Sequence, residues 1–458
     1  MVDSEHIGKK ASLPFFILAA AAFILTGIFG FTASIVTAFG EVNHDLLPFE
    51  KIRPLHTLFA IVGVLAGLHG WVCFMTVKRS KKKSFSLSVL GFSLLLLFTV
   101  GAGLSLFFGK FSGREYFSWP TVWSVPLILS LLILIYLLCK TFSHLYSKSP
   151  EGFWLVGFGV LFILIGQVES ALWLVSHIGN NYVRDLTVQW HGIDTFFAGL
   201  NAFSYGIGVF VLQKDPKPLR KKWLYAIAVF SLLFTFGHHH YVSPQPHFLK
   251  ILAFIASMIA MFSFVKHLRA YRRKSKERTA TKSANEALFG SVELWTVVSF
   301  GSGILFAIPQ LNLIIHGTYL IVIHAMGSMI GVQMMLVFTA GFSIFKPVNQ
   351  KSVNRIKLGV RLTNISLILM WILMGITGLI KGIMRFDYSY YEINSATQYS
   401  LYFLPVLGSI LLVALYLLSS SLIISSVQKN KDVVSTNKLV KIYFNKINNS
   451  LKYLTQTK

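Results

Sequence analysis

Histidines recur at the ends and in the middle of several apolar stretches of this chain, and histidine is the commonest metal-binding side chain. His316 and His324 lie eight residues apart in one such stretch, which is about 12 Å along a helix. His191 begins another stretch, and His238 and His239 end a third. A histidine inside a membrane helix is costly and usually marks a ligand, a pathway or a counter-ion. These residues are therefore the first candidates for chemistry.

The spacing of the histidines suits two kinds of redox site. Three imidazoles from His191, His238 and His239 would bind iron, copper or zinc and leave coordination positions open for a substrate. His324 stands alone on its helix face and suits the axial position of a haem whose other face is open. A second haem needs ligands from two helices, and His56 supplies one of them. Spacing alone leaves both the metal and the haem open.

The elements that must position these side chains are membrane helices. Of the 458 residues, 54% are hydrophobic and 13% are charged, and apolar runs long enough to cross a bilayer recur throughout. Periodicity and turn signals predict about twelve spans, at 13–36, 56–77, 85–108, 120–141, 152–176, 188–212, 222–238, 248–267, 291–309, 314–342, 357–381 and 399–425. We expect an all-α polytopic membrane protein with one twelve-helix domain, residues 1–428, and a polar basic tail, residues 429–458.

Charge and cysteine usage narrow the class further. The net charge is +25, but the basic residues cluster in alternate loops, Lys78–Lys83, Lys214–Lys222, Lys266–Arg278 and Lys346–Lys357. This bias places those loops, both termini and the tail in the cytoplasm and the candidate histidines in the outer half of the membrane. The charge therefore indicates a lipid environment and no nucleic-acid partner. The two cysteines form no CxxC or CxxCH, which argues against a disulfide framework or covalently attached haem.

Four motifs resemble the haem–copper oxidase superfamily, catalytic subunit I, and most closely the large cytochrome b subunit of nitric oxide reductases. RPLHT, residues 53–57, resembles the low-spin haem motif, and GREYFSWP, residues 113–120, is similar to an external-loop motif of the reductases. Residues 221–246 resemble the segment built around KWLY and GHHYYW, and residues 316–326 resemble the HGT…AHGH helix. The motifs follow in order from about residue 46 to 341, so the resemblance implies a subunit I-like bundle.

The resemblance assigns roles to the histidines. His56 would be an axial ligand of a low-spin haem b, and His324 would bind the iron of a high-spin haem b. His191, His238 and His239 would hold a non-haem metal, which is iron in the reductases and copper in the oxidases.

Three further residues belong to the surroundings of the haems in the same resemblance. Arg53 is part of the low-spin haem motif, and His316 matches a residue near the haem propionates. Glu115 matches a glutamate that helps to bind calcium between those propionates. Calcium prefers several oxygen ligands, so one glutamate alone does not make a site.

The chain departs from the family pattern at the second low-spin haem ligand. Met326 stands where relatives carry a histidine. Methionine is a competent axial ligand and raises the potential of a haem relative to two histidines. Ligation by Met326 and simple packing are the two interpretations, and we favour ligation.

The acids of the reductases are also replaced. Thr195 stands four residues after His191, where the reductases usually carry a glutamate on the iron, and Asp194 points about 100° away. Ser118 replaces the second acid of the external-loop motif, and residues 251–264 are uncharged. Glu169, within the fifth predicted span, either supplies the missing carboxylate or forms a structural pair.

Thr195 also helps to distinguish nitric oxide reduction from oxygen reduction. Thr195 also occupies the site of the redox tyrosine of some oxygen-reducing members, and neither Tyr225 nor Tyr241 matches the tyrosine position of the others. We therefore expect a nitric oxide reductase of the bacterial cytoplasmic membrane. Its electrons would come from a c-type cytochrome or cupredoxin-like subunit on the outer face. A terminal oxygen reductase and a non-enzymatic haem sensor or carrier are the alternatives.

Overall fold

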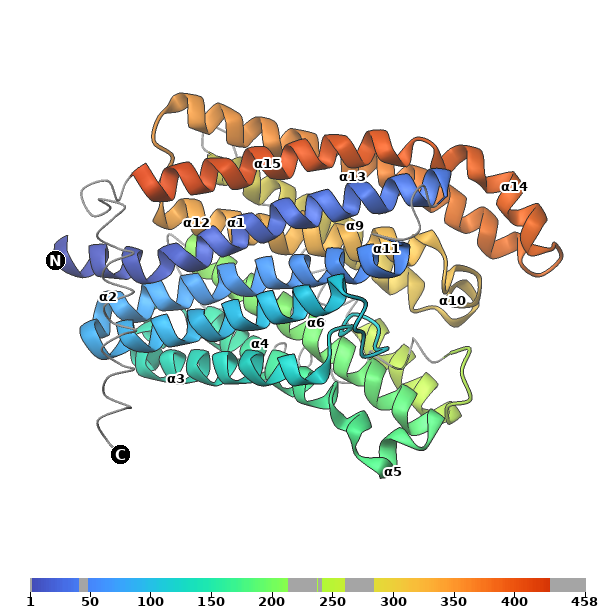
Figure 1. Cartoon of the computed structure of the whole chain (residues 1–458), viewed down its shortest axis with the longest axis horizontal. Coiled ribbons are helices and arrows are strands. Elements are labelled where there is room, and N and C mark those ends of the chain that lie inside the picture. Colours follow the sequence, from blue (N-terminus) through green and yellow to red (C-terminus); the bar gives the residue numbers. More distant parts are fainter. Residues whose placement is uncertain (1, 41–47, 213–236, 238–240, 260–283, 429–458) are drawn as a thin grey trace.

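The computed structural model describes residues 2–40, 48–212, 237, 241–259 and 284–428. Within these ranges the chain forms helices and turns and contains no strand, and most helices run along one common axis (Figure 1). Nine helices in the described part are long and apolar enough to cross a membrane: Ser4–Phe39, Phe49–Arg79, Ser84–Phe107, Thr121–Lys148, Gly152–Leu174, Ala284–Phe306, Tyr319–Ile344, Gln350–Met384 and Leu404–Gln428. The predicted all-α polytopic class is confirmed.

The helices follow one another in a simple order. They are α1 (Val2–Phe39), α2 (Phe49–Phe107), η1 (Thr121–Trp123), α3 (Ser124–Lys148), α4 (Pro150–Glu169), η2 (Leu172–Leu174), α5 (Ser176–Gly179), α6 (Tyr182–Leu212), the short helix His247–Ile259, α9 (Ala284–Phe306), α10 (Pro309–Ile315), α11 (Tyr319–Met326), η4 (Gly327–Met334), α12 (Met335–Ile344), α13 (Gln350–Met384), α14 (Tyr390–Leu401) and α15 (Leu404–Gln428).

The described helices are consistent with the predicted twelve spans. Helix α6 has 31 residues and covers the predicted span 188–212, although its first half carries the charged side chains of Arg184, Asp185 and Asp194. The predicted span 222–238 lies outside the described residues except for Gly237, and the span 248–267 is described only as far as residue 259. The predicted cytoplasmic tail, residues 429–458, also lies outside them.

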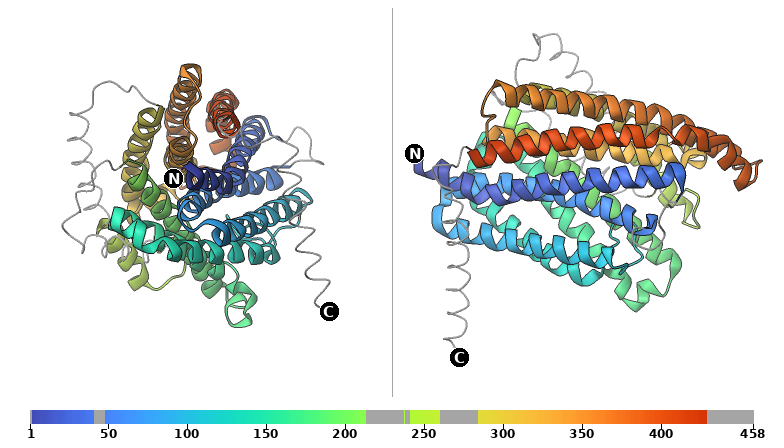
Figure 2. Two further views of the ribbon diagram at one scale, coloured as in Figure 1. Left: turned by 90° about the vertical axis from the view of Figure 1, so that its left-hand side faces the viewer. Right: turned by 45° about the horizontal axis from the view of Figure 1, so that its top comes forward.

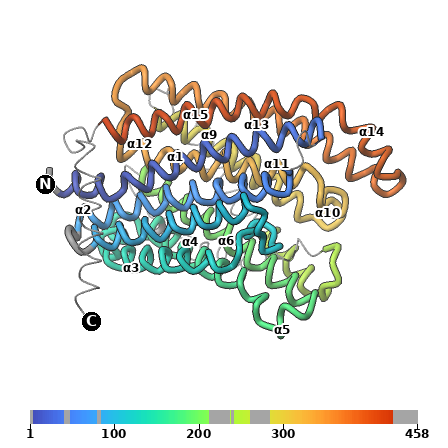
Figure 3. The backbone as a smooth tube through the Cα atoms, in the orientation of Figure 1, coloured from blue at the N-terminus to red at the C-terminus, as the bar shows by residue number. Residues whose placement is uncertain are grey.

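Helix α2 contains two of the predicted spans, and the chain reverses direction between them. A Cβ atom added to Gly103 would lie 3.6 Å from the ring of Phe59, which shows that the two halves pack side by side. Figure 3 shows the two halves as antiparallel rods. Buried His69 stabilises this hairpin: its ring contacts the Ser130 hydroxyl at 3.3 Å, and that hydroxyl donates to the Gly91 carbonyl at 3.0 Å.

The predicted span 314–342 is not one continuous helix. Helix α10 ends at Ile315, and Gly317 has a φ of +74°, a conformation that interrupts a helix and favours glycine. The Thr318 side chain then caps the start of α11 by accepting from the Leu320 N–H. The prediction that His316 and His324 share a helix two turns apart was therefore wrong, because His316 lies in the turn.

A π-helical segment, η4, follows α11 directly. Its Gly331 lies against Trp295 of α9, where an added Cβ would be 2.1 Å from the indole. Gly327 likewise contacts Ser299 of α9, where a Cβ would lie 2.6 Å from the hydroxyl. Two glycines thus let α9 approach the helix that carries His324. π-Helical turns are rare and often occur at functional sites.

Helices α4 and α6 pack with their backbones in contact. Each carries glycines seven residues apart, Gly152, Gly159 and Gly166 in α4 and Gly192, Gly199 and Gly206 in α6. A Cβ on Gly166 would lie 2.5 Å from the Gly192 carbonyl oxygen, and one on Gly199 would lie 2.7 Å from the Gly159 carbonyl oxygen. Small residues on facing stripes allow such close approach inside a membrane. This close packing places the end of α4 beside the part of α6 that carries His191.

Different elements lie at the two ends of the bundle. The loop 108–120, α5, α10 and α14 lie at one end (Figure 1), and α1 begins at the opposite end, as the turned views also show (Figure 2). The first end is the one that the charge bias predicts to be the outer end, and we use that name for it below.

Candidate functional site

His56 lies in the first turns of α2 and faces α1. Its Nδ1–H donates to the Thr26 carbonyl at 2.9 Å, so Nε2 carries the lone pair of the ring. Gly30 of α1 gives the ring its space, because an added Cβ would lie 2.8 Å from the His56 Cε1 atom. An imidazole whose Nδ1 is held by a carbonyl is oriented as a metal or haem ligand requires.

Arg53 lies one turn before His56 and forms an ion pair with Glu115 of the outer loop. The Arg53 Nη2 atom donates to Glu115 Oε1 at 2.5 Å. Both side chains line a cavity of about 350 Å³ at the outer end of α2. In the loop that carries Glu115, Gly113 has a φ of +78°, which glycine adopts freely, and Tyr116 has a φ of +62°, which is uncommon for other residues. The cavity is lined by charged side chains of both signs, Arg53 and Arg114 with Glu50 and Glu115.

His316 is held in the turn after α10 by Arg385, the first residue after α13. The Arg385 guanidinium donates to the carbonyls of His316 at 2.9 Å and Ile314 at 2.7 Å, and to that of Leu313. Burial lowers the pKa of His316, the positive charge of Arg385 lowers it further, and Glu115 opposes both. His316 therefore favours the neutral form more than a free histidine does.

His324 lies in α11 and faces α9. Its Nδ1 is 3.0 Å from the Ser302 hydroxyl. Gly303 again gives the ring space, because a Cβ there would lie 3.1 Å from the His324 Cε1 atom. Phe306 contacts the ring edge-on, with 5.6 Å between ring centres. Helix α9 thus fixes the position and the plane of this imidazole.

Met326 is half-buried and packs against the main hydrophobic core. It lies two residues after His324, about 200° around the helix, so it faces away from α9. The continuation of its helix packs on α2, where a Cβ on Gly67 would lie 2.1 Å from Val337. Met326 therefore lies on the side of α11 opposite to the His324 ring.

His191 of α6 forms a close pair with Glu169, the last residue of α4. The His191 Nδ1 atom is 2.9 Å from each of the two carboxylate oxygens. The side chains retain 28% and 20% of their exposure, so neither is sealed from water. Gly192 allows the contact, since a Cβ there would lie 3.2 Å from the Glu169 Cβ atom. Sequence reasoning did not identify this partner of Glu169, although the glycines spaced by seven residues could have indicated it.

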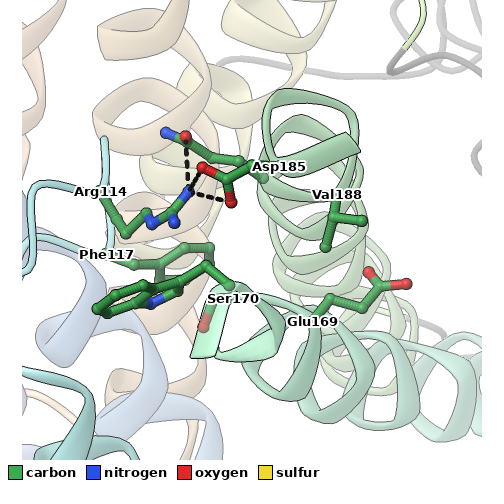
Figure 4. Close-up of a pocket in the computed structure, with 8 residues that line it drawn as sticks. Arg114, Phe117, Glu169, Ser170, Asp185 and Val188 are labelled. Atoms are coloured by element: carbon green, nitrogen blue, oxygen red, sulfur yellow. Dashed lines mark hydrogen bonds and ion pairs between the residues drawn. The ribbon is translucent and has the colours of Figure 1, made fainter. Parts of the chain in front are cut away.

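A second polar group surrounds a small cavity beside Glu169. The Arg114 Nη1 atom donates to Asp185 at 2.8 Å and to Gln189 at 3.2 Å. Figure 4 shows Arg114 and Asp185 facing each other, with the Glu169 carboxylate directed away from that pair. The cavity, of about 10 Å³, has room for one water molecule. The polar group links the outer loop to the outer end of α6.

His238 and His239 lie outside the described residues, but the chain directly after them is described. The Tyr241 hydroxyl donates to the Ala307 carbonyl at 2.8 Å, and burial raises the pKa of Tyr241 to about 12. The Gln245 amide donates to the Thr187 hydroxyl at 2.5 Å, one turn before His191. Residues 241–245 are therefore anchored to the ends of α6 and α9.

The described residues do not by themselves complete a metal site. No group of three or more His, Cys, Asp or Glu side chains converges among them. Glu115 is paired with Arg53, and its role toward calcium remains a prediction.

Sequence reasoning also missed a partly buried tyrosine, Tyr205 of α6. Its hydroxyl donates to Thr296 of α9, because the Thr296 hydroxyl proton is already donated to the Val292 carbonyl at 2.7 Å. Tyr205 lies fourteen residues after His191, about 21 Å along the helix. This distance is too great for a covalent link between the two side chains.

Comparison with known proteins agrees with the helical architecture. The family of cytochrome c and quinol oxidase polypeptide I matches residues 10–411. A nitric oxide reductase subunit of Stutzerimonas stutzeri is 23% identical over 74% of each chain. The cryo-electron microscopy structure of a haem–copper terminal oxidase dimer superposes with a TM-score of 0.67 and 12% identity, covering 92% of this chain and 84% of the other.

The family match covers most of the chain, including every described histidine discussed above. It implies an oxidoreductase of the membrane with haem and a metal centre, of a kind that associates with electron-donor subunits. The chain belongs to the haem–copper oxidase subunit I family.

Proposed function

We propose that the chain is the catalytic subunit of a nitric oxide reductase, which reduces two nitric oxide molecules to nitrous oxide and water. The observation that carries the proposal is the Glu169–His191 pair. It supplies a carboxylate beside the candidate metal ligand, while Thr195 occupies the position of both the reductase glutamate and the oxidase tyrosine. The relative from Stutzerimonas stutzeri supports the same assignment.

The residues fit two haems b and a non-haem iron. His56 and Met326 would hold the low-spin haem, His324 the high-spin haem, and His191, His238 and His239 the iron. The fit rests on the Nε2 lone pair of His56, on the contact that orients His324, and on the space that Gly30 and Gly303 leave around these two rings. When bound, these groups transfer electrons and hold two radical molecules close enough to couple.

Glu169 has two tasks in this proposal. By accepting the Nδ1–H of His191 it fixes the tautomer in which Nε2 faces a metal, and it makes the ring a more basic ligand. The reaction also consumes two protons, and Glu169 both contacts His191 and lines the water-sized cavity beside Arg114 and Asp185. We assign it the last proton-holding position before the substrate.

The remaining assignments concern the outer end. Arg53, His316 and Glu115 would surround haem propionates, and Glu115 would bind calcium there. Since the chain has no CxxCH, a c-type cytochrome or cupredoxin-like subunit would deliver electrons at this end. The protein would lie in the bacterial cytoplasmic membrane with both termini in the cytoplasm.

Replacing the Glu169 carboxylate tests the proposal. In anaerobic assays with nitric oxide and a chemical electron donor, the purified protein should produce nitrous oxide. Glu169→Gln should lower that rate at least tenfold while both haem spectra persist. Glu392→Gln is the matched control, because Glu392 is fully exposed and its recorded contacts are all with Ser389 at the start of α14. Equal rates for Glu169→Gln and the control would contradict the role of Glu169.

Oxygen reduction is the alternative within the same family. It would require a tyrosine linked to a metal-binding histidine. Among the described residues, the Tyr205 and Tyr241 hydroxyls are bonded to Thr296 and to the Ala307 carbonyl, and Tyr225 lies outside the described residues. Metal analysis separates the two reactions. One non-haem iron for two haems supports the reductase, and copper supports the oxidase.

A further inference from the structure

The hydrogen bonds of Ser302 determine which atom of His324 carries a proton. A serine hydroxyl has one proton, and Ser302 donates it to the Ser299 carbonyl at 3.0 Å, since a carbonyl can only accept. The contact between Ser302 Oγ and His324 Nδ1, at 3.0 Å, must then be donated by the histidine. His324 is therefore protonated on Nδ1, and its Nε2 atom carries the lone pair.

The same turn of α9 also gives the ring its space. Ser302 and Gly303 are neighbours, so one turn supplies both the hydroxyl and the room for the imidazole. Phe306, one turn further, contacts the ring edge and restricts its rotation.

We propose that Ser302 is a positioning residue that sets the orientation and basicity of His324 as the ligand of the high-spin haem. The inference rests on the proposed haem at His324. A donated Nδ1–H gives an imidazole partial anionic character, which strengthens its bond to iron and lowers the potential of the haem. Ser302 would not contact the substrate, and it would act only through its hydrogen bond to His324.

Substitution of Ser302 in the haem-loaded protein tests the proposal. Ser302→Ala removes the hydroxyl acceptor and should lower the iron–histidine stretching frequency measured by resonance Raman spectroscopy. The midpoint potential of the high-spin haem should rise in the same variant. Ser302→Thr keeps a hydroxyl at the same position and should restore both values.

The control substitution is Ser299→Ala. The Ser299 hydroxyl is buried and has no hydrogen-bond partner among the described residues, while its carbonyl is part of the backbone and survives the change. In Ser299→Ala, the iron–histidine stretching frequency and the midpoint potential of the high-spin haem should match those of the unmodified protein. If Ser302→Ala leaves both values unchanged, or Ser299→Ala shifts them equally, the proposal is wrong.

A separate variant distinguishes this failure from a failure of the proposed function. His324→Ala should abolish the high-spin haem signal. If the signal persists, His324 is not the ligand, and both the haem assignment and the role of Ser302 are overturned. If the signal is lost while Ser302→Ala changes nothing, only the role of Ser302 is overturned.

Discussion

Each of the three described histidines that we assign as ligands has its Nδ1 atom opposite an oxygen acceptor. His56 faces a backbone carbonyl, His191 a carboxylate and His324 a hydroxyl. The three acceptors differ in charge, so the three imidazoles differ in basicity although they are the same residue type. At the residue scale, these hydrogen bonds account for how one residue type could serve three different centres.

Gly30 provides a direct test of the His56 assignment. Gly30→Ala would place a Cβ 2.8 Å from the imidazole and should displace it, with loss of most of the low-spin haem absorbance in difference spectra. Gly157→Ala is the control, since a Cβ there meets nothing within 4 Å. Retention of the full low-spin signal in Gly30→Ala would show that His56 does not bind that haem.

His316 makes stability depend on pH. Because burial and Arg385 lower its folded-state pKa, the unfolded chain binds this proton more readily than the folded chain. The stabilisation is present above about pH 6.5, the ordinary histidine pKa, and is lost as the pH falls below it. Thermal unfolding in detergent measures this effect. When the pH is lowered from 7.5 to 5.5, the midpoint temperature should fall less in His316→Asn than in the unmodified protein. Parallel declines would contradict this account.

At the scale of elements, glycine decides which helices meet. The facing stripes on α4 and α6 bring Glu169 to His191, and Gly327 and Gly331 bring η4 to α9. In both places the absence of a Cβ on the glycine lets the neighbouring helix come close, as is common where small residues pack between membrane helices. The geometry of the proposed site therefore depends on glycines that take no part in the proposed reaction.

Gly199 tests this dependence. Gly199→Ala would place a Cβ 2.7 Å from both the Gly159 oxygen and the Ile163 nitrogen, so the helices must separate. Overpacking of this kind costs roughly 1–3 kcal/mol, and the thermal midpoint should fall accordingly. The non-haem metal content should fall as well, because Glu169 moves away from His191. Gly157→Ala serves again as the control, and equal behaviour of both variants would contradict the account.

The sequence predicted the spans well and the contacts between them poorly. Apolar length identifies a membrane helix without knowledge of its neighbours, which is why α1, α3 and α13 lie where periodicity predicted them. The prediction missed the break at Gly317, because the positive φ of a single residue cannot be recognised within an apolar run. Glu169 was found as a buried acid, but its partner lies 22 residues away on another helix, and local pattern does not show such pairing.

At the scale of the whole molecule, one end of the bundle carries the polar site residues. Arg53, Glu115, Arg114, Asp185 and His316 all lie at the end formed by the loop 108–120 and α10, while α1 begins at the other end (Figure 2). The basic loops of the sequence alternate between spans, and this charge bias predicts that the site faces outward.

Labelling of introduced cysteines checks this orientation. In a Cys139→Ser background, a membrane-impermeant thiol reagent added to intact cells should label Lys110→Cys and leave Lys351→Cys unlabelled until the cells are opened. Both positions are exposed, and the remaining cysteine, Cys73, is buried. The reverse pattern would place the site on the cytoplasmic side and contradict the charge argument.

The central claim is that this family member reduces nitric oxide. The most direct measurement assays one purified preparation twice with the same chemical electron donor. The first assay contains nitric oxide and no oxygen, and the second contains oxygen and no nitric oxide. We predict one nitrous oxide molecule for every two nitric oxide molecules consumed, at a rate well above the rate of oxygen consumption. Oxygen consumption without nitrous oxide formation would contradict the claim and identify the protein as a terminal oxygen reductase.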